Sequence, residues 1–224
     1  MTLAILARDL ETGTFGVAVT SSTVASGGLD GTVHVPRFGI CLGISVPGRC
    51  QKVGGAILQS GLGAEASMAA MIGADTGIAY RQLGAIDSAG LVAGYTGEQC
   101  VPYAAHRVGP DYIVMGNWLA GSQVIDGLQR GFVESEGEAF VRRLIASLEG
   151  GRDSGGEISD PLASAAVVAY GDREGTHLAD YRVDLADDPV ADLLKIHERA
   201  APVQPLIELG RVEPHTLWGA LARP

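Results

Sequence analysis

The chain has 224 residues, of which 46% are hydrophobic, and this is enough to fill the core of one large domain. Its 26 acidic and 16 basic residues give a formal net charge of −10, so the surface is expected to repel nucleic-acid phosphates and anionic lipid headgroups. The apolar runs are far shorter than the roughly 20 residues of a membrane-spanning helix, and Arg8 and Asp9 interrupt the first run too early for a signal peptide. We therefore expect a cytoplasmic protein with no nucleic-acid or membrane partner.

The predicted elements begin with strands. Leu3 to Arg8 and Phe15 to Thr20 are short apolar runs joined by a Glu-Thr-Gly turn, a pattern typical of a hairpin. Residues 32–36 and 38–46 form a second predicted pair, which is interrupted at Pro36 because proline cannot donate a ladder hydrogen bond.

Helices and further strands follow. The stretch GGAILQSGLGAEASMAAMIGA, from Gly54 to Ala74, predicts a helix-turn-helix pair with its break at Gly61–Gly63. Four strands are then predicted, at residues 80–87, 91–96, 102–107 and 111–115. We expect them to form a second β layer, separated from the first by the helical pair.

The last part of the chain alternates between these patterns. Helices are predicted at residues 121–135 and 136–148, strands at 163–170 and 177–185, and a final helix at 189–199 with Asp188 as its N-cap. The order ββββ-αα-ββββ-αα-ββ-α favours an α+β fold, a four-layer αββα sandwich of antiparallel sheets. We expect a single domain over residues 1–200 and a C-terminal extension, 201–224, that packs on the domain or on a partner subunit.

Three separated stretches carry a resemblance to a known family. They are MTLAILARDLETGTFGVAVTSS, YRQLGAIDSAGLVAGYTGEQCVPYAAHRVGPDYIVMGNWLAG and VDLADDPVADLLKIHERA, spread from residue 1 to about 200. In this order they resemble the Ntn-hydrolase-like family known as domain of unknown function 1028. The resemblance implies an αββα sandwich with the nucleophile at the start of the first strand, in agreement with the order of elements.

Thr2 is therefore the candidate nucleophile. Met1 precedes a small residue, which favours removal of the initiator and leaves Thr2 with a free α-amino group. The reference pKa of an α-amine is about 7.7–8.0, so a neutral fraction exists near pH 7 to accept the hydroxyl proton. The alternative is that Thr2 is an ordinary strand residue, since threonine favours β-structure.

Other polar residues are candidates for the same site. Ser21 and Ser22 follow the second strand, where the hairpin brings them back toward Thr2; we assign Ser22 a catalytic and Ser21 a substrate-binding role. Asn117 closes a strand after Gly116, in a Gly-Asn pair shared with the family, and its amide is a candidate donor to an oxyanion. The alternatives are turn and cap roles.

Four more residues are expected to bind substrate. Arg49 and Lys52 lie in ISVPGRCQKVGG, where the sequence departs from the family, and we expect this stretch to be a loop that forms a cationic pocket wall and favours a carboxylate. Glu98 lies in a glycine-containing loop and is a candidate to orient the amine. Ser164 begins the Ser-Ala-Ala sequence that the family shares.

Other polar residues are assigned structural roles or left as alternatives. We expect the Arg8-Asp9 pair to form an ion pair or turn and His106 to be a hydrogen-bonded structural histidine. The cysteines, Cys41, Cys50 and Cys100, are odd in number and show no CxxC spacing, which indicates reduced thiols. The five histidines show no HxH or HxxxH spacing, so we expect neither a metal site nor a cofactor.

The sequence thus predicts an amidohydrolase that acts on a small amide, cyclic imide or acylated amine through a Thr2 acyl-enzyme, in a homodimer or larger homo-oligomer. Two alternatives stay open. One is a small-molecule binding or assembly protein on the same fold, and the other is a cysteine hydrolase built on Cys50 or Cys100.

Overall fold

The computed structural model describes residues 2–28, 31–44, 49–158, 161–171 and 177–202. In these ranges the chain forms two antiparallel sheets and five α-helices, the mixed α+β fold that the sequence predicts. The strands are β1 (Thr2–Arg8), β2 (Phe15–Ser21), β3 (Val33–Val35), β4 (Gly39–Ile44), β5 (Gln82–Asp87), β6 (Val92–Thr96), β7 (Ala105–Gly109), β8 (Tyr112–Asn117), β9 (Ser164–Tyr170) and β10 (His177–Val183). The helices are α1 (Arg49–Gln59), α2 (Ala64–Gly73), α3 (Ser122–Glu134), α4 (Phe140–Asp153) and α5 (Pro189–Ala200).

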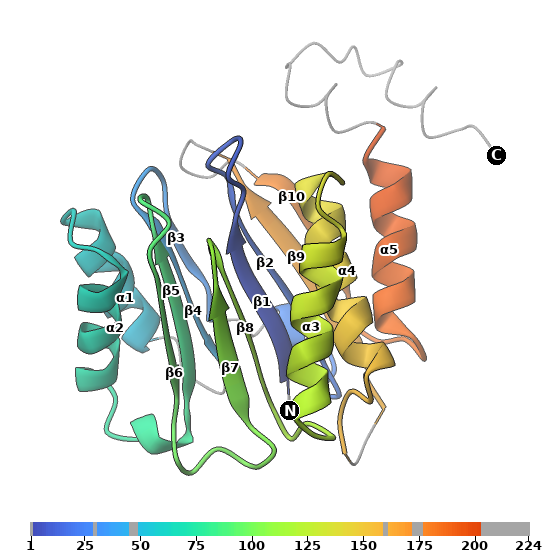
Figure 1. Cartoon of the computed structure of the whole chain (residues 1–224), viewed down its shortest axis with the longest axis horizontal. Coiled ribbons are helices and arrows are strands. Elements are labelled where there is room, and N and C mark those ends of the chain that lie inside the picture. Colours follow the sequence, from blue (N-terminus) through green and yellow to red (C-terminus); the bar gives the residue numbers. More distant parts are fainter. Residues whose placement is uncertain (1, 29–30, 45–48, 159–160, 172–176, 203–224) are drawn as a thin grey trace.

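The elements form four layers (Figure 1). Sheet A has the strand order β10-β9-β2-β1-β8-β7, and sheet B has the order β3-β4-β5-β6. Helices α3, α4 and α5 pack on the outer face of sheet A, whereas α1 and α2 pack on sheet B. The two sheets face each other through contacts of β1 and β8 with β5.

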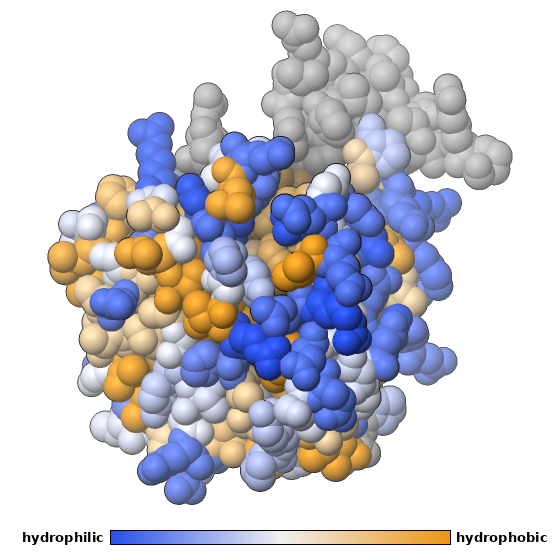
Figure 2. Space-filling model, in the orientation of Figure 1, coloured by the Kyte–Doolittle hydropathy of each residue, from blue (hydrophilic) through white to orange (hydrophobic). Residues whose placement is uncertain are grey.

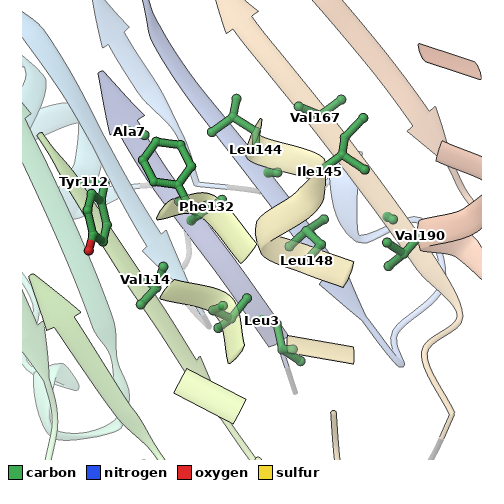
Figure 3. Close-up of a cluster of buried hydrophobic side chains, with 14 of the residues drawn as sticks. Leu3, Ala7, Tyr112, Val114, Phe132, Leu144, Ile145, Leu148, Val167 and Val190 are labelled. Carbon is green, nitrogen blue, oxygen red and sulfur yellow. The ribbon is translucent and has the colours of Figure 1, made fainter. Parts of the chain in front are cut away.

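Three apolar clusters fill the three interfaces between these layers. The first joins sheet A to its helices, and Figure 3 shows Leu3 on β1 among side chains of α3, α4 and α5. The second lies between the sheets and includes Ala4 and Leu6, which lie on the opposite face of β1 from Leu3. The third joins sheet B to α1 and α2. Successive residues of β1 therefore pack alternately against the helices and between the two sheets.

The pairing of strands into sheets differs from the expected two blocks. In the described ranges five hairpins form, namely β1–β2, β3–β4, β5–β6, β7–β8 and β9–β10, of which the sequence predicts the first as a hairpin and the second as a strand pair. However, sheet A combines the first, fourth and fifth hairpins, and sheet B combines the second and third. The expectation that the first four strands form one layer was wrong, because a hydrophobic pattern indicates which residues are buried and not which strand each one pairs with.

Helix α1 also corrects an expectation. It begins at Arg49, so Arg49 and Lys52 belong to its first turn and are not loop residues. Cys50 and Gln51 are buried between them, and the Cys41 thiol donates to the Gln51 carbonyl oxygen at 3.2 Å. This contact with β4 starts the helix earlier than the apolar spacing after Gly54 indicates. The expected extension 201–224 lies almost wholly outside the described residues.

The β1–β2 turn has the geometry that its sequence predicts. Gly13 has φ +71°, the left-handed conformation that glycine adopts without steric penalty. Asp9 supports the turn by accepting hydrogen bonds from the Glu11 N–H at 3.2 Å and from the Thr12 hydroxyl at 2.6 Å. Arg8 forms an ion pair with Asp111 at 2.8 Å, which confirms structural roles for both residues of the Arg8-Asp9 pair.

Replacing Gly13 with valine is expected to lower the free energy of unfolding by about 1–2 kcal/mol. A Cβ at this position meets only the Arg8 guanidinium, at 3.9 Å, so the loss comes from backbone conformation and not from a clash. Denaturant unfolding measures it. Gly13→Asn is the matched control, since asparagine tolerates positive φ, and equal losses in both variants would contradict this account.

Four rings meet at the end of the sandwich where β1 turns into β2. The His34 ring stacks on the Tyr170 ring with centroids 4.5 Å apart, and the Phe15 ring is tilted against the His34 ring with centroids 5.8 Å apart. His177 meets Tyr170 edge-on at 5.3 Å. Burial, followed by the nearby His177, lowers the pKa of His34 to about 4. His34 is therefore neutral at physiological pH.

The free energy of unfolding is expected to fall as the pH drops below about 6.5, partly because of His34. Its pKa is lower in the folded than in the unfolded chain, so the unfolded chain binds more protons between these two values. The contribution of His34 to the free energy of unfolding is thus fully present above about pH 6.5 and is lost as the pH falls toward 4. Allowing for the solvent that reaches the ring, we expect His34→Gln to remove about 1 kcal/mol of the loss between pH 7 and 5. Denaturant titrations at both pH values measure it, and an unchanged pH slope in the variant would contradict the assignment.

The surface combines apolar and polar regions. Figure 2 shows hydrophobic residues gathered over the sheet B side of this face and hydrophilic residues over α3. Leu91, next to β6, and Tyr80, just before β5, are among the exposed large apolar residues. In the described ranges, none of the helices combines the length and apolar character that crossing a bilayer requires. The homo-oligomer and the cytoplasmic location stay predictions.

Candidate functional site

Thr2 is the first residue of β1, and its neighbours in sheet A are polar. In the antiparallel register Thr2 pairs with Asn117 on β8, and Leu3 pairs with Thr20 on β2. The next position along β2 is Ser21, which therefore lies beside Thr2 and itself pairs with Ser164 on β9. Four residues predicted for the site thus form one row across the end of sheet A: Ser164, Ser21, Thr2 and Asn117. We call them the polar row.

The polar row lies on the face of sheet A that looks toward sheet B. Side chains alternate between the two faces of a strand, so residues two positions apart share a face. The residues two positions further along these strands all belong to the cluster between the sheets: Ala4, Val19, Met115 and Ala166. Side chains directly opposite each other in antiparallel strands have Cβ atoms about 4.5–5.5 Å apart. Thr2 is therefore within reach of Asn117 on one side and Ser21 on the other.

Sheet B meets the polar row through Gln82, a residue that the sequence analysis did not single out. Gln82 is the first residue of β5 and is fully buried. Its Oε1 accepts a hydrogen bond from Asn117 Nδ2 at 2.9 Å, and its Nε2 lies 3.1 Å from the Thr96 hydroxyl and 3.0 Å from each of two carbonyl oxygens, of Ala105 and Gly116. One amide thus connects β5 and β6 of sheet B to β7 and β8 of sheet A.

The contacts of Gln82 determine how both amides are oriented. Two of the three atoms around Nε2 are carbonyl oxygens, which only accept hydrogen bonds, so the nitrogen and not the oxygen of Gln82 must face them. Oε1 then faces Asn117, which must donate. An amide nitrogen carries two hydrogens, so Asn117 keeps one N–H for a further acceptor.

The backbone around Asn117 is held closely. A Cβ at Gly116 would lie 2.9 Å from the backbone oxygen of Thr2, so glycine allows the close approach of β8 to β1. After Asn117 the chain turns at Trp118, which has φ +58° and whose N–H donates to the Val101 carbonyl oxygen at 3.1 Å. The N–H of Leu119 donates to the carbonyl oxygen of Tyr103 at 3.0 Å. These contacts hold the end of β8 against the loop that follows β6.

His106 extends the polar network away from the row. Its Nδ1 lies 2.8 Å from the Thr96 hydroxyl, which also contacts Gln82, and burial lowers the pKa of its imidazole. A neutral, hydrogen-bonded ring is the structural histidine that the sequence predicts. The network therefore runs from His106 through Thr96 and Gln82 to Asn117.

At the other end of the row, Ser164 organises the segment after β2. Its hydroxyl donates to the Thr23 carbonyl oxygen at 2.6 Å, lies 2.6 Å from the Ser26 hydroxyl and accepts from the Ser26 N–H at 3.1 Å. Ser21 accepts from the Thr23 N–H at 3.1 Å. These bonds give Ser164 a structural task beside the substrate-binding role expected of it.

The remaining predicted site residues lie near this end of the sandwich but outside the row. Ser22 comes one position after β2 ends, so it is not part of the strand register. Glu98 is exposed in the loop after β6, whose last residue, Thr96, pairs with Gln82. Arg49 and Lys52 are exposed on the first turn of α1. The strand register brings together Thr2, Ser21, Asn117 and Ser164. Among the described residues, no hydrogen bond or ion pair joins Arg49, Lys52 or Glu98 to this row.

The cysteine environments do not favour a thiolate nucleophile. Burial raises the pKa of Cys41 to about 12, and burial is also the first cause that raises the pKa values of Cys50 and Cys100. All three are free thiols. Across the part of the chain that the structure describes, His, Cys, Asp and Glu form no cluster of three or more suited to a metal ion.

The matches to known proteins cover most of the residues that form this fold. A search of curated proteins gave no match. Among solved structures, the chain is similar to the crystal structure of protein SPO2555 from Silicibacter pomeroyi, described as a DUF1028 protein, with a TM-score of 0.79 and 27% sequence identity over 89% of this chain and 85% of that one. The model of the family described as "Family of unknown function (DUF1028)" matches residues 2–193. The chain therefore belongs to the DUF1028 family.

Proposed function

We propose that the chain is an amidohydrolase with an N-terminal nucleophile, built on an Ntn-hydrolase-like sandwich, in which Thr2 attacks a small amide, cyclic imide or acylated amine. The observation that carries the proposal is the position of Thr2. It is the first residue of β1, and its neighbours in register on the inter-sheet face are Asn117 and Ser21. A hydroxyl nucleophile with its own α-amine as base and an amide N–H donor for the oxyanion are groups that acyl transfer to threonine uses.

The first half of the reaction forms an ester. After removal of Met1, the neutral α-amine of Thr2 accepts the proton of its own hydroxyl, directly or through a water molecule. Oγ1 bonds to the substrate carbonyl carbon, and the carbonyl oxygen becomes an oxyanion. When the C–N bond breaks, the proton held by the α-ammonium passes to the leaving nitrogen, and Thr2 carries the acyl group.

Asn117 is proposed to donate its remaining N–H to the oxyanion. Because Gln82 accepts the other N–H, the amide is held before the substrate arrives, and a preorganised donor loses little free energy to reorganisation. Gln82 is buried and does not contact the substrate in this scheme, so it is a positioning residue. Ser21, on the other side of Thr2, is proposed to bind the substrate or the attacking water.

The second half of the reaction resolves the ester. Water attacks the acyl carbon and gives its proton to the α-amine, and the Thr2 oxygen then leaves and recovers a proton from the ammonium. The products are a carboxylic acid and an amine. A cyclic amide gives both groups in one molecule, and a cyclic imide gives a carboxylic acid and a carboxamide in one molecule.

We propose further that the substrate carries a carboxylate. Arg49 and Lys52 are exposed at the start of α1, which follows β4, and Ile44 at the end of β4 pairs with Gln82. The two cations therefore belong to the same end of the sandwich as the polar row. Glu98, on the loop after β6, is proposed to bind the α-ammonium when it forms.

A labelling experiment tests the nucleophile. Intact-mass measurement first establishes whether Met1 is removed, and the protein is then treated with a β-lactone, whose ring is opened by a nucleophilic hydroxyl so that the adduct retains the whole mass of the reagent. Peptide mapping is expected to find the adduct on Thr2. Pretreatment with iodoacetamide serves as the control, because blocked labelling would indicate a cysteine nucleophile.

The alternative is a non-catalytic binding or assembly protein on the same fold. Retained Met1 would hold the amine in a peptide bond, overturn the proposed mechanism and favour this alternative. An unlabelled Thr2 in protein that has lost Met1 would do the same.

A further inference from the structure

A separate pocket of about 210 Å³ lies at the opposite end of the sandwich from Thr2. Its wall includes Arg8, the last residue of β1, whereas Thr2 is the first. At about 3.3 Å per residue the two ends of this strand are roughly 20 Å apart. Figure 1 shows the N-terminus and the β1–β2 turn at opposite ends of β1. The proposed hydrolase site therefore leaves this pocket without a role.

Two guanidinium groups line the pocket. Arg8 is directed partly to Asp111, which it contacts through Nη1 at 2.8 Å, and this ion pair is largely shielded from solvent. Arg37 lies in the turn between β3 and β4 and is exposed. Among the described residues no hydrogen bond or ion pair is found for its side chain. In a chain with a net charge of −10, a free arginine beside a paired one gives this pocket a local excess of positive charge.

The backbone of Arg37 adds to this observation. Its φ is +69°, a conformation that glycine or asparagine adopts at much lower energy than arginine. The turn is closed by the Phe38 N–H, which donates to the Val35 carbonyl oxygen at 3.0 Å, and this bond does not involve the arginine side chain. Neither the turn nor an ion pair accounts for an arginine here. Unfavourable backbone conformations of this kind concentrate at functional sites.

The rest of the wall is aromatic. His34 and Tyr170 line the pocket with their rings stacked at 4.5 Å, and Phe15 lies next to His34. Asp111 is paired with Arg8, and Asp9, which follows Arg8 in the chain, already accepts hydrogen bonds from the Glu11 N–H and the Thr12 hydroxyl. The pocket thus combines flat apolar walls with cationic donors.

We propose that this pocket binds a small planar carboxylate. Arg37 binds the carboxylate through its two parallel N–H groups, Arg8 adds charge from the inner end, and the planar body of the ligand lies against the Tyr170 and His34 rings. A guanidinium matches a carboxylate in bidentate geometry, and flat walls favour a flat body. Because the neutral His34 contributes no charge at physiological pH, the attraction comes from the two arginines.

Isothermal titration calorimetry with benzoate tests the proposal. Benzoate is expected to bind the parent chain saturably, and Arg37→Gln is expected to weaken binding by about tenfold or more, since one charge-assisted bidentate contact is lost. Arg37→Gly removes the same contact while relieving the backbone, so it is expected to weaken binding equally and to raise the melting temperature. Arg130→Gln is the matched control, because Arg130 is an arginine of α3 whose side chain contacts only Ser154, at 3.2 Å, among the described residues.

The comparison ligands decide the chemistry and the site. Cyclohexanecarboxylate has the charge without the planar ring and is expected to bind more weakly than benzoate, and inorganic phosphate more weakly still. The Thr2→Ala variant is expected to bind benzoate like the parent, which separates this pocket from the proposed hydrolase site. Absence of saturable benzoate binding, equal affinity in Arg37→Gln, or tighter binding of phosphate than of benzoate would overturn the proposal.

Discussion

Replacing Thr2 with alanine is expected to lower amide hydrolysis by about a thousandfold or more, because the nucleophilic oxygen of the covalent step is removed. Folding is expected to survive. Alanine is small enough to permit removal of Met1, and Thr2 lies at the end of β1, partly buried and outside the apolar clusters. The measurement is kcat/KM on an amide substrate found by screening carboxylate-bearing amides.

Thr2→Ser is the control for this variant. It keeps the oxygen and loses only a methyl group, so measurable turnover should remain. The pH profile of the parent enzyme should have a lower limb near the pKa of the α-amine, about 7.7–8.0 in reference compounds, because the protonated amine no longer accepts the hydroxyl proton. Equal rates for Thr2→Ala and the parent, both lacking Met1, would leave Thr2 as an ordinary strand residue.

Replacing Gln82 with leucine is expected to lower the free energy of unfolding by about 2–4 kcal/mol, although the two side chains have similar volumes. The substitution leaves the Ala105 and Gly116 carbonyl oxygens and the Asn117 amide without the partner that each has in the core. Buried polar groups that lose their partner incur the full desolvation penalty. Denaturant unfolding measures the loss.

The matched control is Gln59→Leu, at the exposed end of α1, which is expected to change stability by no more than about 0.5 kcal/mol. A double-mutant cycle with Asn117→Ala then isolates the contact between the two amides. Because the residues share a hydrogen bond at 2.9 Å, their losses should not add. Additive losses, or a Gln82→Leu variant as stable as the parent, would show that the two amides are not coupled.

The local part of the fold was predictable because its signals lie within a few residues of each other. The Glu-Thr-Gly turn predicted the β1–β2 hairpin, and Gly13 has the positive φ that such a turn requires. Asp188 before Pro189 predicted the start of α5, and its carboxylate accepts from the Ala191 N–H at 3.0 Å. The removable Met1 and the family resemblance indicated Thr2, and the ends of neighbouring strands indicated Ser21 and, together with the shared Gly-Asn pair, Asn117; the roles of these residues stay predictions.

Partners that are distant in the sequence were not predictable in this way. The ion-pair or turn role of Arg8 and Asp9 was predicted, but the partner of Arg8, Asp111 on a turn of another hairpin, was not. The sequence predicts a loop at Arg49 and Lys52, because the apolar residues at the start of α1 do not recur with helical spacing. The burial of Cys50 and Gln51 against β4 extends that helix, and only the packed sheet provides the contact.

The order of the elements, the β1–β2 hairpin and the residues at the ends of the strands could therefore be predicted from the sequence, since turn chemistry and hydrophobic period act over short distances. Which hairpins share a sheet depends on the packing of the whole chain, because any hairpin offers the same backbone donors and acceptors at its edges. This packing also decided the role of Gln82. As a sequence position it is a polar residue before an apolar run, and its four contacts exist only where the two sheets close on each other and exclude water.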